Sequence, residues 1–381
     1  MSAQDAKKQN VQTREERATM PAILTMAQGL ASMLVERLGE CHIVVMQDFP
    51  DPDALASAYA HQLISSQYDI AADLVYGDEV SHAQNRALVR VIGMNVSKFD
   101  GAMDLSKYQG AVFVDNQGTT APRIVDALEA AGVPALLVVD HHELQERLHP
   151  EFTDIRRVGA TATLYAEYLA QGLLPMDKAR REHTLAATAL MHGILTDTHG
   201  LIRAGADDFT AAAFLSRYRD ADLLEQIMSQ ARTKQTMETI QKALGNRSIV
   251  ENFSISGIGY IRLQDRDSIP QAADFMMTEE NVHTAIVYGI IQGDEPASER
   301  LVGSLRTIKL TLAPDEFIKS VFGKDAAGRY HGGGKALAGA FEVPVGFLAG
   351  SGGDEFRELK WQLFDGQVKR KLLAKIGAVR G

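Results

Sequence analysis

The sequence predicts an α/β protein in which a parallel sheet with helices on both faces is followed by a smaller α/β domain across a cleft. Two observations support this prediction. Between residues 42 and 172, short apolar segments alternate with helical segments four times, the pattern of a parallel sheet covered by helices. A second set of apolar strands follows between residues 253 and 312, and a chain of 381 residues accommodates about two domains.

The expected strands of the first domain have the sequences HIVVM, IAADLVY, GAVFVD and PALLVVD, at 42–46, 70–76, 110–115 and 134–140. Helical segments follow them near 53–66, 83–93, 120–132 and 161–172. In the second domain, strands are expected at 253–263, 282–292 and 300–312, and a helix at 315–322. A glycine-rich run at 328–341 precedes a segment that we expect to be helical.

We therefore divide the chain into five parts. Residues 1–40 form a polar tail and an amphipathic helix that packs on its own domain or on a second subunit. Residues 41–225 form the metal-binding catalytic domain, and 226–250 a linker helix. Residues 251–345 form the substrate-binding domain, and 346–381 a helical extension with a basic amphipathic helix at 356–376.

Composition and charge narrow the class of protein. The net charge is −10, and acidic and basic residues balance after Gln271, so the acidic excess lies in the first 270 residues. Net acidity argues against a protein that coats duplex nucleic acid. The sequence contains no segment that resembles a signal peptide and no run of about 20 apolar residues that could form a membrane helix. Cys41 is the single cysteine, so an internal disulfide is excluded. We expect a cytoplasmic protein.

Aspartates cluster where the expected strands end. Asp51 and Asp53 follow the first strand in the motif PDPDA, and Asp115 ends the third. In parallel α/β sheets, ligands bind beyond the carboxyl ends of the strands. Two carboxylates at i and i+2 can point at two neighbouring cations, and Asp115 could bridge them. Each motif alone is more typical of a capped turn.

The fourth strand ends in Asp140, His141 and His142, which is the most specific signal. Adjacent histidines at a sheet edge are costly to bury without a partner, so they favour a metal or catalytic role. Asp197 follows a helical run in the segment GILTDTHG. Oxygen donors with imidazole and no thiolate favour Mn²⁺ or Mg²⁺. Two such ions would activate a water for phosphoester hydrolysis.

The second domain contains two candidates for anion binding. Gly332, Gly333 and Gly334 could wrap an anion with their backbone N–H groups, and Lys335 adds a positive charge. Arg306 lies at the end of a strand, where its guanidinium could clamp a phosphate. Singly, each feature is more often structural.

These motifs together resemble the DHH phosphoesterase superfamily with its DHH-associated C-terminal domain. The resemblance covers residues 40–345 and rests on PDPDA, Asp115, the Asp-His-His triplet, Asp197 and the glycine run preceded by SLR. SHAQNRALV at 81–89 and RRVGATATL at 156–164 also look like segments of the family. The sequence looks closest to the nano-RNase and pAp-phosphatase group.

The resemblance implies a role for each matching position. Asp51 and Asp115 would hold the first metal, with Gln47 beside it, and Asp53, Asp115, His141 and Asp197 would hold the second. Asp115, His141 and His142 would be the catalytic residues, and Asp140 would orient the histidine pair. Substrate would be gripped by a set of residues from both domains: Arg306, Gly332, Gly333, Gly334, Lys335, Asn85 and Arg86.

Two positions depart from the family pattern. Gln47 stands where a histidine is usual, and an amide oxygen is a weaker ligand than imidazole for Mn²⁺. Lys335 stands where the family has the histidine of GGGH, and lysine holds a phosphate but does not shuttle protons near neutral pH.

The resulting hypothesis is a manganese-dependent or magnesium-dependent phosphodiesterase that cleaves linear dinucleotides and other very short oligoribonucleotides, such as pGpG or pApA, to 5′-mononucleotides. A 3′-phosphatase acting on pAp and a cyclic-dinucleotide phosphodiesterase would use the same site. A nucleotide-binding regulator with a weakened site is an alternative from a different class. We also expect a homodimer and no membrane partner.

Overall fold

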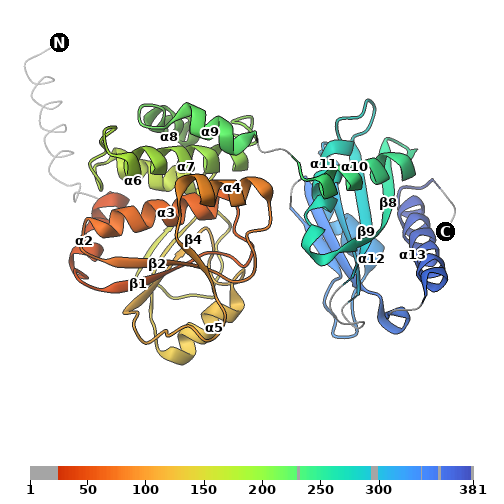
Figure 1. Cartoon of the computed structure of the whole chain (residues 1–381), viewed down its shortest axis with the longest axis horizontal. Coiled ribbons are helices and arrows are strands. Elements are labelled where there is room, and N and C mark those ends of the chain that lie inside the picture. Colours follow the sequence, from red (N-terminus) through yellow and green to blue (C-terminus); the bar gives the residue numbers. More distant parts are fainter. Residues whose placement is uncertain (1–24, 230–231, 293–298, 336, 351–352, 379–381) are drawn as a thin grey trace, which may run out of the picture. The chain divides into compact units, whose positions relative to one another are not determined.

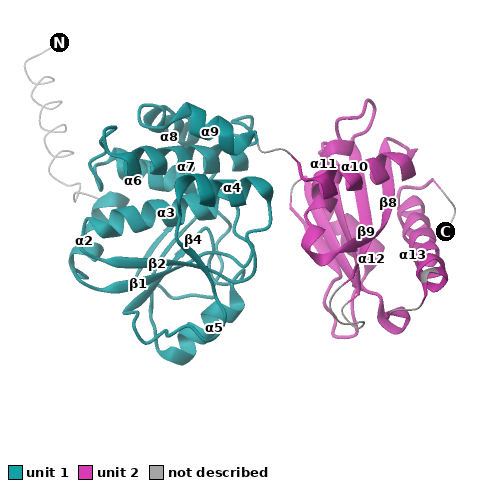
Figure 2. Ribbon diagram, in the orientation of Figure 1, with its two compact units in different colours: residues 1–230 teal, residues 231–381 magenta. Residues whose placement is uncertain are grey.

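The computed structural model describes residues 25–229, 232–292, 299–335, 337–350 and 353–378. The chain divides into two compact units, Met1–Gln230 and Ala231–Gly381 (Figures 1 and 2). The predicted polar tail at 1–20 lies outside the described residues. The α/β class with a parallel sheet and a second sheet domain is confirmed.

The first unit is built on a six-stranded parallel sheet of order β3-β2-β1-β4-β5-β6. Its strands are β1 (Cys41–Val45), β2 (Ala71–Tyr76), β3 (Val96–Lys98), β4 (Gly110–Val114), β5 (Ala135–Asp140) and β6 (Phe152–Ile155). The four predicted strands are the central ones. The edge strands β3 and β6 have three and four residues, too few for an alternating apolar pattern to be visible in the sequence.

Helices cover both faces of this sheet (Figure 1). They are α2 (Met26–Val35), α3 (Pro52–Ser66), α4 (Ala83–Ile92), α5 (Pro122–Ala131), α6 (Thr161–Ala170), α7 (Arg181–Asp197), α8 (Ala206–Leu215) and α9 (Ala221–Met228). Successive residues of β1 point to opposite faces of the sheet and pack in different hydrophobic cores. Val44 lies in the core that contains α3, α6 and α7, and Ile43 in the core that contains α5.

The strand order explains where a ligand would bind. From β1 the chain proceeds through β2 and β3 toward one edge of the sheet, and from β4 it proceeds through β5 and β6 toward the other edge, so the direction reverses between β1 and β4. Ligands of doubly wound sheets bind at this switch point, beyond the carboxyl ends of the strands on either side of it. The loop after β1 with Asp51, the first turn of α3 with Asp53, and the loop after β4 with Asp115 therefore lie at the switch point.

The second unit has a mixed six-stranded sheet of order β11-β12-β10-β9-β8-β7, in which only the β8–β9 pair is parallel. The strands are β7 (Ser248–Val250), β8 (Phe253–Arg262), β9 (Thr284–Gln292), β10 (Arg300–Thr307), β11 (Gly332–Gly334) and β12 (Ala338–Pro344). The helices are α10 (Lys234–Asn246), α11 (Ser268–Met276), α12 (Pro314–Phe322) and α13 (Asp354–Lys375).

The expectation of a helical segment after the glycine run is wrong. Gly332–Gly334 form strand β11, which pairs with β12 in antiparallel fashion. A Cβ on Gly332 would lie 2.3 Å from the carbonyl oxygen of Ala340, and one on Gly334 would lie 2.6 Å from that of Ala338. The glycines are therefore needed for close strand pairing.

The expected linker helix at 226–250 divides between the two units. Ile227 of α9 packs in the core of the first unit. Helix α10 is capped by Thr233, whose hydroxyl accepts the N–H of Thr236, and it buries Ile240 and Ala243 against α11 in the second unit. Helix α13, which lies within the predicted 346–381 extension, likewise packs on its unit, because its residues Val368 and Leu372 are buried.

Among the described helices, none combines the length and the apolar character needed to cross a membrane. The cytoplasmic location stays a prediction.

Candidate metal centre

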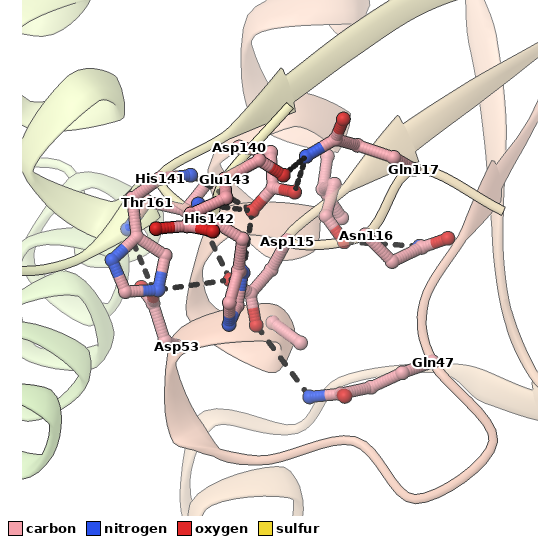
Figure 3. Close-up of polar contacts among 12 residues, drawn as sticks. Gln47, Asp53, Asp115, Asn116, Gln117, Asp140, His141, His142, Glu143 and Thr161 are labelled. Carbon is pink, nitrogen blue, oxygen red and sulfur yellow. Dashed lines mark hydrogen bonds and ion pairs between the residues drawn. The ribbon is translucent and has the colours of Figure 1, made fainter. Parts of the chain in front are cut away.

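Asp53 is fully buried, and its carboxylate caps a helix distant in sequence. It accepts the N–H groups of Thr161 at 2.6 Å and Ala162 at 2.7 Å, the first two residues of α6 (Figure 3). The residue before α6, Ala160, has no side chain that could cap it, so Asp53 supplies the missing acceptor. Asp51 caps its own helix α3 by accepting the N–H of Ala54 at 3.0 Å.

Asp115 has a φ of +56°, in the left-handed region that residues other than glycine rarely adopt. Its N–H donates to the carbonyl of Val139 on β5, and its Oδ1 accepts the hydroxyl of Thr161 at 3.0 Å. The side-chain amide of Gln47 lies 3.5 Å from its Oδ2. A strained backbone that is held by such contacts is typical of functional sites.

Hydrogen bonds fix the side chains of the Asp-His-His triplet. Asp140 accepts the backbone N–H of His141 at 2.8 Å, and it lies 2.8 Å from Nδ1 of His142. The Nδ1 atom of His141 lies 3.2 Å from the carbonyl oxygen of Val158. This contact directs the other ring nitrogen, Nε2, into the cluster of carboxylates (Figure 3).

The Nε2 atom of His141 is buried and has no hydrogen-bond partner. It lies 3.4 Å from Oδ2 of Asp197, 3.5 Å from Oδ1 of Asp115 and 3.9 Å from Oδ2 of Asp53. An orphaned imidazole nitrogen that faces three carboxylate oxygens fits a metal ion. Two sets of possible metal-ligand atoms lie close together in the structure. One comes from Asp53, His141 and Asp197, and the other from Asp115, Asp140, His141 and His142.

The electrostatics of the cluster also favour a cation. Burial, together with the charge of Asp51, raises the pKa of Asp53 to about 8. Burial and the charges of Asp51, Asp53 and Asp197 raise the pKa of Asp115 well above its usual range. Buried carboxylates so close together resist ionisation unless a positive charge compensates them.

Asp140 behaves differently from these carboxylates. Burial acts to raise its pKa, but the hydrogen bonds and charge of His142 outweigh burial and lower it. Asp140 therefore serves the histidines as an ionised acceptor. Asp51 lies outside both groups of ligand atoms, although its charge reaches Asp53 and Asp115.

Sequence reasoning missed Gln117 and Thr161. Gln117 donates its side-chain amide to Asp140 at 2.7 Å and to the carbonyl of Glu143 at 3.1 Å, and its oxygen accepts the N–H of Gln145 at 2.7 Å. Gln117 lies two residues after Asp115 in the segment VDNQG. Its position just beyond the end of a strand was the one sequence feature that could have marked it as a site residue. Thr161 lies in the segment 156–164, which was noted only as resembling the family.

The two residues of the first unit that we expected to bind substrate, Asn85 and Arg86, donate hydrogen bonds to backbone carbonyls. Asn85 is buried and donates its amide to the carbonyl of Pro50 at 3.0 Å, so it positions the loop that leads to Asp51. The guanidinium of Arg86 donates to the carbonyl of Ser81. Their contact with substrate stays a prediction.

The second unit contains a pocket of about 350 Å³ lined by several predicted residues. Arg306, Gly333, Gly334 and Lys335 line it, and Arg266, which sequence reasoning missed, joins them. Arg306 is oriented by Asp274 and by the hydroxyl of Ser304, each at 2.7 Å.

The glycines are less available to an anion than we expected. Gly332 does not line this pocket, and the N–H of Gly334 donates to Asp315 at 3.2 Å. An anion in the pocket would share Arg306 with Asp274 and Arg266 with Glu342.

Comparison with known proteins supports the fold. No protein-family model matches the chain. It is 32% identical over 332 residues to the uncharacterised protein MJ1633 of Methanocaldococcus jannaschii, with 86% of this chain aligned. The chain spans about 62% of the length of that relative.

Among solved structures, the chain resembles an exopolyphosphatase-related protein of Bacteroides fragilis with a TM-score of 0.64 and 13% identity, over 92% of this chain and all of that one. A manganese-bound RecJ exonuclease aligns over 95% of this chain and 98% of its own, with a TM-score of 0.47 and 13% identity. The chain therefore shares the two-domain fold of the exopolyphosphatase-related protein, with the parallel sheet and the second sheet domain that the sequence predicted.

Proposed function

We propose that this chain is a DHH phosphoesterase that uses two divalent ions to hydrolyse very short oligoribonucleotides, such as pGpG or pApA, to 5′-mononucleotides. The observation that carries the proposal is the buried Nε2 atom of His141, which has no hydrogen-bond partner and lies within 3.9 Å of oxygens of Asp53, Asp115 and Asp197. A divalent cation would accept the imidazole nitrogen as a ligand and neutralise the buried carboxylates.

The residues present fit the ligand preferences of Mn²⁺ and Mg²⁺. Asp53, Asp115, His141 and Asp197 would hold one ion. Asp51, Asp115 and Gln47 would hold the other, with the Gln47 side chain turned so that its oxygen faces the ion. The chemistry that two such ions supply when bound is activation of a water and neutralisation of charge on the phosphoryl group.

The protein side chains around the ligands have positioning tasks. Asp140 fixes the ring of His142 through Nδ1, so that the ring can present Nε2 to a phosphoryl oxygen. Gln117 in turn fixes Asp140 and the backbone of the loop that follows the histidines. Thr161 holds Asp115 through its hydroxyl and Asp53 through its N–H group.

The pocket of the second unit supports a short nucleotide as substrate. A volume of about 350 Å³ lies at the small end of the range for ligand pockets, which suits one nucleotide better than a long strand. Arg266, Arg306 and Lys335 offer positive charge for a phosphate, and Ile269 and Val302 offer an apolar surface for a base. The net charge of −10 also disfavours long nucleic acids.

The test is to incubate the purified protein with pGpG, pApA, pAp and cyclic di-GMP, with Mn²⁺ and Mg²⁺ in parallel, and to separate the products by chromatography. We expect mononucleotides from the linear dinucleotides. Phosphate release from pAp, or opening of the cyclic dinucleotide, would instead support the alternative substrates. Binding without turnover of any of these compounds would favour the regulator.

Three variants make the test specific. Asp115→Asn and Asp197→Asn keep the side-chain shape and remove a negative charge from the cluster, so we expect turnover to fall by at least a hundredfold. Asp126→Asn is the matched control, because Asp126 is exposed and pairs only with Arg147 at the surface. Equal activity of all four proteins at saturating metal would contradict the proposal.

We also retain the prediction of a homodimer, for which helix α13 offers a surface.

A further inference from the structure

Helix α13 exposes an apolar stripe along the side that faces away from its own unit. Phe356, Leu359 and Leu363 are 41%, 59% and 59% exposed, and their spacing of three and four residues places them on one face. Val368 and Leu372, on the opposite side, are buried in the core of the second unit. The helix is therefore anchored by one face and presents a second apolar face to its surroundings.

Gly366 extends this stripe by one helical turn. A Cβ at this position would meet no atom within 4 Å, so no contact within the described chain requires a glycine here. Glycine is also unfavourable in the interior of a helix. A residue without a side chain on an exposed helix face allows another helix to approach closely. Close approach of a second helix would explain why a glycine occupies position 366.

The exposed charges of α13 change sign along its length. Glu355 and Glu358 are exposed in the first half, and Arg370 and Lys371 are exposed in the second. The other charged side chains between them have partners within the unit: Arg357 contacts Gln292, Lys360 pairs with Glu299, and Asp365 pairs with Lys369. Two such helices side by side in parallel would place like charges together. In an antiparallel pair, the acidic half of each helix faces the basic half of the other.

We propose that α13 pairs with α13 of a second copy of this chain, antiparallel and related by a two-fold axis that passes beside Leu363. In this register Leu363 faces Leu363 of the second copy. Glu355 and Phe356, about two turns before Leu363, then face Arg370 of the second copy, which lies two turns after it. Such a contact is self-complementary, as the interface of a closed dimer must be.

The two-fold register can be tested by a cysteine at the axis. In a Cys41→Ser background, a residue introduced by Leu363→Cys is the only cysteine of the chain. Because position 363 faces itself, we expect a disulfide-linked dimer under mild oxidation. Glu358→Cys is the matched control: Glu358 is also exposed on the same helix, but it lies away from the stripe and does not face itself, so the cysteine should stay largely unlinked.

The charges provide a second test that does not depend on cross-linking. Glu355→Arg places a positive charge opposite Arg370, so we expect at least a tenfold weaker dimer in sedimentation equilibrium. The double variant Glu355→Arg and Arg370→Glu exchanges the charges and should restore the dimer. Leu363→Glu should give a monomer with an unchanged far-ultraviolet circular dichroism spectrum, because Leu363 is exposed in the single copy.

Two results would overturn the proposal: a wild-type protein that is monomeric at every concentration tested, or a dimer that Leu363→Glu leaves intact. A dimer broken by Leu363→Glu but not rescued by the charge exchange would overturn the antiparallel register. These measurements need no substrate and no metal, so their outcome is independent of the proposed phosphodiesterase activity.

Discussion

Asp53 and Thr161, which are more than a hundred residues apart in sequence, are joined by a hydrogen bond of 2.6 Å from the backbone N–H of Thr161 to Oδ2 of Asp53. The hydroxyl of the same threonine donates to Asp115 at 3.0 Å. One residue at the start of α6 therefore holds two of the carboxylates that face His141. It thereby links helix α3, which contains Asp53, to the loop after β4, which contains Asp115.

This double contact predicts that Thr161→Val reduces activity while Thr161→Ser preserves it. Valine keeps the backbone N–H and the shape of threonine but loses the hydroxyl, so Oδ1 of Asp115 loses a donor. We expect a 10- to 100-fold loss of kcat with Mn²⁺. Steady-state kinetics on a linear dinucleotide, with metal concentration varied, checks the effect. Equal loss in the valine and serine variants would show that the hydroxyl is not the cause.

Asp115→Asn should stabilise the metal-free protein and abolish its stabilisation by metal. The wild-type carboxylate is buried beside other carboxylates, which raises its pKa and makes its ionised form costly. Removing this charge should raise the free energy of unfolding by about 1–3 kcal/mol. Wild type should gain further stability when Mn²⁺ is added, because the ion binds the folded state, and the variant should gain little.

Thermal melts of both proteins, with Mn²⁺ and with a chelator, check this prediction. Asp126→Asn serves as the exposed control and should behave like wild type in both conditions. A variant that is less stable than wild type in chelator would indicate that the buried carboxylate is held mainly by hydrogen bonds.

The sequence was sufficient to predict the central sheet and the side chains that converge at its edge. Apolar strands, three of the four followed closely by Asp or His, are visible without a structure because burial on both faces requires apolar residues. Asp53, Asp115 and His141 could be named for this reason, whereas Asp197, at the end of helix α7, was named from its TDT motif through the resemblance. The resemblance to a family assigned them to metals, and the structure brings their oxygen and nitrogen atoms together.

Other features depend on contacts that a linear pattern does not contain. Gln117 reaches Asp140 only because β4 and β5 are neighbours, and glutamine has no motif of its own. Residues Gly332–Gly334 were expected to form an anion-binding loop because glycine runs often do so. Here the close approach of β11 and β12 requires them. The edge strands β3 and β6 are too short to show a period.

Gln117→Leu should lower activity in a protein that still folds. Leucine fills a similar volume but makes none of the three hydrogen bonds that tie Gln117 to Asp140, Glu143 and Gln145. The ring of His142 would lose its fixed direction, so we expect a 10- to 100-fold lower kcat. The cost in stability should be about 1–3 kcal/mol, since buried polar partners are left unpaired.

Gln171→Leu is the matched control for this substitution. Gln171 is exposed and donates only to Glu167 on its own helix, so activity and stability should stay at wild-type levels. Rescue of activity by Gln117→Glu is not expected, because a second carboxylate would repel Asp140 instead of donating to it. Full activity of Gln117→Leu would contradict the positioning role.

Two buried histidines that stay neutral in the folded state should contribute a loss of stability to the first unit as pH decreases below about 6.5, while the raised pKa values of Asp53 and Asp115 contribute in the opposite direction. Burial lowers the pKa of His61 to about 3 and that of His192 to about 4. The unfolded chain binds a proton at each residue near pH 6.5. Between pH 6.5 and about 4 the unfolded state therefore holds more protons, and each histidine removes roughly 1.4 kcal/mol of stability per pH unit.

His61→Gln isolates one of these contributions. Glutamine can still hydrogen-bond the hydroxyl of Tyr165, which lies 3.1 Å from Nδ1 of His61, but it does not titrate. The slope of stability against pH between 6.5 and 4 should therefore decrease by about 1.4 kcal/mol per pH unit. Urea unfolding must be followed by hydrogen exchange in α3, because Trp361, the single tryptophan, reports on the second unit. His149→Gln, at an exposed histidine, should leave the slope unchanged; an equal decrease in both variants would mean that burial of His61 is not the cause.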